Sequence, residues 1–121
     1  MDGKFEVIFC IVDAGFSDSV MSAARECGAR GGTVLSARGT AREDAEKLFN
    51  ISIQPEKEIV MILVNVDIKD NILHAIYKEV GLNTPAQGIA FSIPVEDVVG
   101  LSSSPVKAPE EEEKKEENQA N

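Results

Sequence analysis

Two segments of this chain are apolar on both faces of an extended backbone, and they limit how the chain can fold. Residues 4–12 carry apolar side chains at both alternating sets of positions, namely Phe5, Val7, Phe9 and Ile11 in one set and Ile8, Cys10 and Val12 in the other. Residues 57–66, KEIVMILVNV, repeat this pattern. Alternation with a period of two is typical of strands, and two apolar sets predict a strand that is buried on both sides. The fold must therefore cover both faces of a sheet.

A helical pattern follows each of these strands. After the first strand, apolar side chains recur at helical spacing between Ser17, a predicted N-cap, and Gly28, a predicted helix stop. After the second strand, Asp67 is the predicted N-cap and Gly81 the stop of a helix whose apolar stripe comprises Ile68, Ile72, Leu73, Ile76 and Val80. Thr33–Arg38 and Ile89–Ile93 are predicted strands, and residues 94–101 a turn with a short final edge strand.

The predicted order is β-α-β followed by a second β-α-β. In a chain of 121 residues this order predicts the α+β class and a ferredoxin-like βαββαβ sandwich, an antiparallel four-stranded sheet with two helices on one face. We expect one domain over residues 1–103, followed by an acidic tail over residues 104–121. Residues 107–121 carry six glutamates, three lysines and no large apolar side chain, so we expect the tail to be disordered.

Two helices cover only one face of such a sheet. We assign Ile8, Cys10 and Val12, with alternate residues of Ile59–Val64, to the face that would remain in water. Removing a few hundred Å² of apolar surface from water is worth several kcal/mol at about 25 cal/mol per Å², enough to help drive association. The pattern therefore predicts a homo-oligomer with stacked sheets. The alternative is that the long connection or the tail folds back over the sheet.

Charge and hydropathy exclude several kinds of partner. A net charge of −9 opposes nucleic-acid binding, because phosphates require a basic surface. The longest apolar run, Ile59–Val64, is too short to cross a bilayer, so we expect no direct membrane insertion. Residues 1–12 lack the pattern of a signal peptide, and we expect a cytoplasmic protein. Cys10 and Cys27 lack the spacing of metal ligands and are predicted to be reduced, small buried hydrophobic residues.

We find no combination of residues typical of an active site, and we predict that the protein is not an enzyme. His74 is the single histidine and lies beside the apolar stripe of the second helix. We interpret it as a surface or packing residue rather than a catalytic residue or metal ligand. The acidic side chains of Glu43, Asp44 and Glu46 are interpreted as a solvated charged surface. We expect no metal cofactor.

The stretch GGTVLSARGTARED, residues 31–44, ends an apolar pattern in a group of charges. The apolar pattern does not resume until after Pro55, and connections of this length are uncommon unless they are functional or disordered. Arg38, Gly39, Thr40 and Arg42 form either the floor of a ligand cleft or an ordinary strand exit with solvated arginines. The sequence TPAQG, residues 84–88, is either a second part of that cleft or a simple connector.

Several short stretches, in their order along the chain, resemble the PII signal-transduction (nitrogen regulatory P-II) family. They are GARGGTV, the Arg38-Gly39 step, PEKEIVMILV and GIAFSIPVEDVVGL, and the resemblance covers about residues 4–101. Family members are trimers whose sheets stack around a central axis, which agrees with the predicted second apolar face. The resemblance implies a regulator in which a small effector binds in the intersubunit cleft and biases a long effector loop, the T-loop. That loop docks on a target protein, and targets in the family include membrane transporters and metabolic enzymes.

In the family an adenine nucleotide occupies this cleft, and the matching positions give the candidate binding residues. They are Gly32, Thr33, Arg38, Gly39, Thr40, Pro85, Ala86, Gln87, Gly88 and Ile89. Glycines allow amide groups to approach a phosphate, Thr33 offers a hydroxyl group, and Arg38 offers a countercharge. The resemblance also makes loop 39–55 the partner-binding T-loop, with candidate contacts at Arg42, Glu43, Asp44, Lys47 and Phe49.

The chain also departs from the family pattern. Ile89 stands where the family has a phosphate-binding lysine, and Gly100 and Ser102 stand where it has arginines. Each lost charge-assisted contact is worth about 1.5 to 3 kcal/mol, so we expect weakened triphosphate binding. AMP, ADP, ATP, a cyclic nucleotide and no nucleotide at all remain open.

The T-loop is shorter than is usual in the family. The only tyrosine, Tyr77, lies on the second predicted helix, and the loop glutamine that typical members use near Gly39 is absent. We therefore expect neither uridylylation nor sensing of 2-oxoglutarate. A ligand-independent trimeric interaction module is the alternative function.

Overall fold

The computed structural model describes residues 4–40 and 55–100, which contain four strands and two helices. In chain order they are β1 (Phe5–Asp13), α1 (Ser17–Glu26), β2 (Thr33–Arg38), β3 (Glu56–Asn65), α3 (Val66–Val80) and β4 (Ile89–Val95). The predicted βαββαβ order is confirmed. The predicted domain boundary at residues 103 and 104, the tail, and most of loop 39–55 lie outside the described residues.

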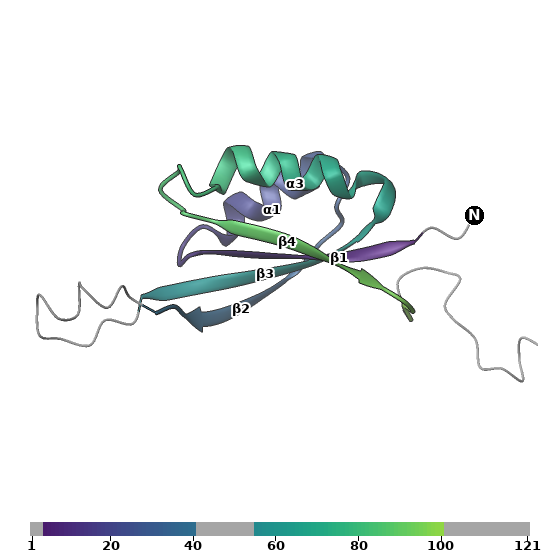
Figure 1. Ribbon diagram of the computed structural model, residues 1–121, viewed down its shortest axis with the longest axis horizontal. Helices are drawn as coiled ribbons and strands as arrows, with labels where there is room; N and C mark the ends of the chain where they lie inside the picture. The colour runs from purple at the N-terminus through teal and green to yellow at the C-terminus, as the bar shows by residue number, and fades with distance from the viewer. Residues whose placement is uncertain (1–3, 41–54, 101–121) are drawn as a thin grey trace, which may run out of the picture.

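The strands form one antiparallel sheet in the order β2-β3-β1-β4, and both helices lie on the same side of it (Figure 1). β1 therefore runs along the centre and pairs with β3 on one side and β4 on the other. The predicted class and the ferredoxin-like sandwich are confirmed. At one end of the sheet β1 and β2 stop and β3 and β4 start, so these four strand ends lie side by side. This end of the sheet is called the loop end.

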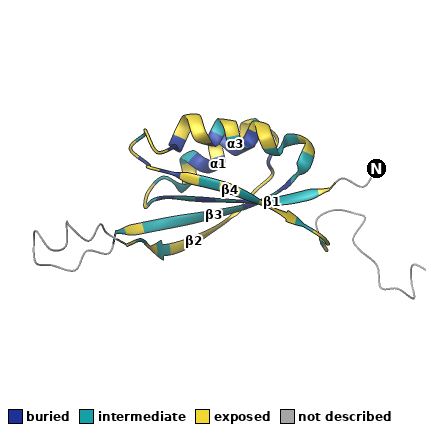
Figure 2. Ribbon diagram, in the orientation of Figure 1, coloured by how far each residue is buried: buried dark blue, intermediate teal, exposed yellow. Residues whose placement is uncertain are grey.

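The core lies between the helices and the facing side of the sheet. Its fully buried side chains are Ile8, Cys10, Val12, Val20, Val60, Ile62, Ile72, Ile76 and Val80. The helices are dark blue toward the sheet and yellow away from it in Figure 2. The assignment of Ile8, Cys10 and Val12 to the face left in water is therefore wrong, because these residues point into the helical layer. Alternation identifies β1 as a strand, but because both sets are apolar it does not determine which set faces the helices.

The opposite side of the sheet, called the open face here, is covered by no element of the described ranges. Strand register places one apolar set on it, comprising Phe5, Val7, Phe9, Ile11, Leu35, Ile59, Met61, Leu63, Ile89, Phe91, Ile93 and Val95. Leu35, Ile89, Phe91 and Ile93 are 44%, 53%, 44% and 46% exposed. The rings of Phe9 and Phe91 stack across the β1–β4 pair with their centroids 5.4 Å apart. The prediction of a second apolar face is confirmed, although its residues are the other set.

Two polar side chains start the helices, and neither is the predicted cap. Asn65 is the N-cap of α3, and its Oδ1 accepts a hydrogen bond from the amide of Asp67 at 2.8 Å. At α1 the N-cap position is Phe16, and the amide of Ser17 donates instead to Glu58 Oε1 at 3.3 Å. The predicted caps Ser17 and Asp67 are therefore wrong. Asp67 comes two residues late, and a carboxylate from β3 replaces the local cap of α1.

β4 forms one edge of the sheet. β4 runs to Val95 and contains Pro94, and it is an edge strand, where a proline is tolerated because its missing N–H faces solvent. Residues 96–100 form no strand, so the predicted final edge strand is not found within the described part of the chain.

The end of α1 is as predicted. Gly28, with φ of +106°, follows the Cys27 C-cap of α1, and the predicted helix stop is confirmed.

Candidate functional site

The first group of predicted site residues lies at the loop end of the sheet, where the chain enters and leaves residues 41–54. Arg38 is the last residue of β2 and is paired in register with Glu56 at the start of β3. The next residue, Gly39, donates its amide hydrogen to the carbonyl oxygen of Pro55 at 2.8 Å. This bond joins the two described ends of the loop, so Arg38 and Gly39 form its base, and Thr40 follows them in the chain.

The predicted glycine-containing connector, residues 84–88, is a compact turn held from two sides. The amide of Gln87 donates to Thr84 O at 3.0 Å, and Gly88 donates to Val80 O, the last residue of α3, at 2.6 Å. The carbonyl oxygen of Ala86 accepts from the amide of Asp13 at 3.0 Å. The turn is thereby tied both to α3 and to the end of β1, so it lies at the loop end with Gly39.

Gly88 is required by packing in this turn. A Cβ atom at Gly88 would lie 2.3 Å from Val80 O and 3.0 Å from Val12 Cγ1, so no side chain fits. Its amide hydrogen points inward to Val80 O and is already used. Gln87 has a φ of +49° and is exposed, as is Pro85. A ligand at this turn would therefore meet Gln87 and Pro85 rather than the amide of Gly88.

Two other predicted site residues, Thr33 at the start of β2 and Gly32 just before it, do not join this group. They lie at the opposite end of the strand, about five residue steps or roughly 17 Å from Arg38. Gly32 also has no space for a side chain, because a Cβ atom there would lie 2.8 Å from Met61 O. Thr33 is exposed. Within one protomer the predicted nucleotide residues thus form two separate groups.

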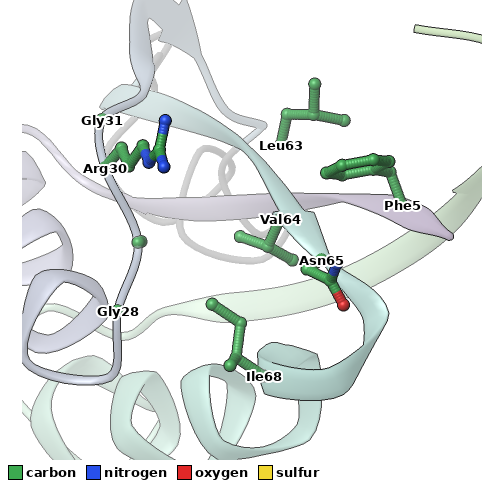
Figure 3. A pocket seen from close by; sticks show the side chains of 9 residues that line it. Phe5, Gly28, Arg30, Gly31, Leu63, Val64, Asn65 and Ile68 are labelled. Atoms are coloured by element: carbon green, nitrogen blue, oxygen red, sulfur yellow. The ribbon is translucent and has the colours of Figure 1, made fainter. Parts of the chain in front are cut away.

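A pocket of about 420 Å³ opens beside this second group (Figure 3). It lies between the α1–β2 connection, the start of β1 and the end of β3, and it is lined by Phe5, Gly28, Ala29, Arg30, Gly31, Leu63, Val64, Asn65 and Ile68. Figure 3 shows Phe5 and Leu63 on one side of β3 and Ile68 on the other. The predicted site did not include this pocket.

The loop end also contains charged residues that were not among the predicted site residues. Lys57 Nζ donates to Asp13 Oδ1 at 2.5 Å, and the two side chains are 23% and 34% exposed. Glu58 points to the helical side, where its Oε1 accepts from the amide of Gly15 at 2.9 Å. A polar cleft of about 510 Å³ adjoins this side, lined by Ala14, Ser36, Ala37, Arg38, Glu56, Lys57 and Glu58. No local sequence signal marks these contacts, because their partners are more than 40 residues apart.

The histidine and the two cysteines belong to neither of these two groups of site residues. His74 is exposed on α3, and Cys10 and Cys27 are free thiols, one buried and one half-buried. Burial raises the pKa of the Cys10 thiol to about 11, so it stays protonated at neutral pH. Residues 4–40 and 55–100 contain no group of three or more histidine, cysteine, aspartate or glutamate side chains suited to a metal ion. The candidate partner contacts Arg42, Glu43, Asp44, Lys47 and Phe49 lie outside the described residues.

The sequence profile of the family described as Nitrogen regulatory protein P-II matches residues 5–104. This chain belongs to that family. The match spans both groups of candidate residues and the whole of loop 39–55, and the family is one of signal-transduction regulators. The resemblance inferred from the sequence is confirmed.

Solved structures of PII proteins share the fold. Arabidopsis thaliana PII bound to citrate is 26% identical, with a TM-score of 0.64, and the match covers 83% of this chain and 85% of that one. Bacillus subtilis GlnK in complex with ATP is 11% identical, with a TM-score of 0.63 and coverage of 83% and 91%. A PII-like signalling protein from Thermus thermophilus is 18% identical, with a TM-score of 0.59 and coverage of 78% and 90%. No curated protein matches the chain significantly.

Neither helix of the described ranges is long and apolar enough to span a bilayer.

Proposed function

We propose that this PII-family protein is a homotrimeric cytoplasmic regulator that binds an adenine nucleotide between subunits and controls a target protein through loop 39–55. The observation that carries the proposal is the open face. It is apolar across all four strands, and its large side chains Ile89, Phe91 and Ile93 are about half exposed in the protomer. Such a surface favours association, which would create the clefts in which a ligand binds.

The separation of the predicted nucleotide residues supports a site between subunits. Arg38, Gly39 and the 85–88 turn share the loop end, whereas Gly32 and Thr33 lie at the far end of β2. One small nucleotide cannot contact both groups within a protomer. A neighbouring subunit that brings its Gly32 and Thr33 to the loop end would complete the cleft.

The proposed mechanism is a shift between loop states. A ligand changes this equilibrium only by its difference in affinity for the two states. The Gly39–Pro55 hydrogen bond joins the two described ends of loop 39–55 and lies beside the proposed ligand. A nucleotide that contacts Gly39 would therefore favour one arrangement of the loop base, and the target, such as a membrane transporter or a metabolic enzyme, would recognise it.

Calorimetric titration tests the ligand part of the proposal. We expect heat of binding for at least one of AMP, ADP, ATP and a cyclic nucleotide, and we include citrate because Arabidopsis PII was solved with it. Arg38→Ala should weaken binding about tenfold or more through the loss of one charge-assisted contact. Gly39→Asp should abolish it, because its Cβ would lie 3.0 Å from Lys57 Cε and its carboxylate would repel phosphate. Absence of heat with every compound would contradict nucleotide and citrate binding alike.

Sedimentation equilibrium tests the assembly. We expect a species of three times the 13.0 kDa protomer mass. A well-folded protomer that remains monomeric at micromolar concentration would contradict the trimer and the intersubunit cleft together.

The second candidate function is a ligand-independent trimeric interaction module. It is favoured by the engaged amide of Gly88 and by the apolar side chain of Ile89, which leave few groups at the turn for a phosphate. Affinity capture separates the two functions. Retention of a partner by Arg38→Ala, together with its loss on deletion of residues 42–53, would select the module. Retention that requires added nucleotide would select the nucleotide-controlled regulator.

A further inference from the structure

The open face carries a single pair of charged side chains. Of all the residues that strand register places on this face, only Lys57 and Asp13 are charged, and they are bonded to each other. Both lie in the last row of the face, at the loop end. The pair thus forms a charged rim on a surface whose other side chains are uncharged and mostly apolar.

This pair bridges the two parts of the candidate cleft that belong to one protomer. On one side, the Lys57 stem lies against Gly39, since a Cβ atom at Gly39 would lie 3.0 Å from Lys57 Cε and 3.3 Å from its Cγ. On the other side, the amide of Asp13 donates to Ala86 O in the 85–88 turn at 3.0 Å. A ligand lying on both Gly39 and the turn must meet the ion pair.

We propose that Asp13 is a specificity-determining residue of this cleft, which limits the negative charge that a bound nucleotide can carry. The inference rests on the proposed nucleotide-binding function. Lys57 lines the polar cleft at the loop end, and its ammonium group is already bonded to the carboxylate of Asp13. A phosphate group must compete with that carboxylate for Lys57 and is repelled by it. Each additional phosphate charge strengthens the repulsion, so Asp13 favours AMP over ATP.

The test measures the ratio of ATP to AMP affinity by calorimetry at low ionic strength in the full chain. In Asp13→Asn, which keeps the side-chain shape and the backbone amide, the ratio should rise about fivefold, because the lysine is released for phosphate. In Lys57→Met the ratio should fall, because the unpaired carboxylate of Asp13 repels the more highly charged ATP more strongly than AMP. The double variant, which lacks both charges, should bring the ratio back to near the wild-type value. The changes should shrink as salt is added.

Asp70→Asn is the matched control. Asp70 lies in α3, beyond the far end of β3, and its side chain is 88% exposed beside Lys69. Removing its charge should leave the ratio within about twofold of wild type. Thermal unfolding checks that each variant is folded, and Lys57→Met carries the test if Asp13→Asn does not fold.

An unchanged ratio in Asp13→Asn or in Lys57→Met, with nucleotide still bound, would overturn this inference alone and show that the pair is only structural. Absence of binding of AMP, ADP and ATP to the wild-type protein would overturn the proposed nucleotide function and the inference with it.

Discussion

The two faces of the sheet have similar apolar composition but differ in what covers them. On the helical side, Val60 and Ile62 are fully buried under α1 and α3. On the open face, Phe91 and Ile93 have the same chemical character but are 44% and 46% exposed. Apolar alternation therefore specifies that a strand is to be buried, whereas the helices decide which side is buried among residues 4–40 and 55–100. The other side is the one for which we propose contact between copies.

The largest expected effect lies on the helical side. Ile62→Ala should lower the free energy of unfolding by about 2 to 5 kcal/mol, because the side chain is fully buried and leaves a cavity. Urea unfolding measures the change. Tyr77→Ala, at a side chain of α3 that is 64% exposed, is the control and should change it by about 0.5 kcal/mol or less. Similar losses in the two variants would contradict the assigned core.

The Cys10 thiol reports on the same side. Its pKa is raised from 9.0 to about 11 by burial, so at pH 8 it carries about 100-fold less thiolate than an ordinary thiol. We expect Cys27 to react with a thiol reagent first and Cys10 only after unfolding. Because the unfolded state ionises at the lower pKa, the contribution of Cys10 to stability is constant below pH 9 and is lost as pH rises from about 9 to 11. Unfolding measured across this pH range should show that loss in the wild type but not in Cys10→Ala. In the labelling experiment, rapid reaction of Cys10 in the native protein would contradict its burial.

On the open face, truncation should weaken association more than folding. Phe91→Ala removes a half-exposed ring that stacks on Phe9, and we expect a loss of about 2 kcal/mol per interface, or roughly 30-fold in the dissociation constant. Sedimentation measures association, and urea unfolding of the dissociated protein supplies the protomer stability. Unchanged association with strongly reduced protomer stability would show that the open face belongs to the protomer core.

The smallest expected effect concerns the start of α3. Asn65→Ala should cost about 1 kcal/mol of unfolding free energy, because the amide of Asp67 loses its acceptor. Asp67→Ala should cost about 0.5 kcal/mol, through the helix dipole alone. Thermal unfolding of the pair decides between the two caps, and a larger loss at Asp67 would reinstate the sequence prediction.

The sequence was sufficient for the order of elements, because periodicity, glycine stops and turn residues are local signals. It was insufficient for the faces, because neither apolar set of β1 contains enough polar side chains to mark the solvent side. It also missed Glu58 at the start of α1 and the Lys57–Asp13 pair, since the partners of both are more than 40 residues away.

The candidate site was predicted in part. The structure brings Gly39 and the 85–88 turn to one end of the sheet, as their shared role in the prediction requires, but it keeps Thr33 at the other end. It also shows that Gly88 is a glycine because Val80 O leaves no space, which flanking residues alone do not reveal. Whether these residues bind a nucleotide stays a prediction.

Pro94 has a consequence for how copies of this protein can combine. It lies in β4, the outermost strand on its side, and it has no amide hydrogen to offer to an incoming strand. Strand addition along the β4 border is therefore disfavoured at Pro94, which works against fibril growth from that side of the sheet. The proposed stacking of open faces uses a different surface and does not depend on that border.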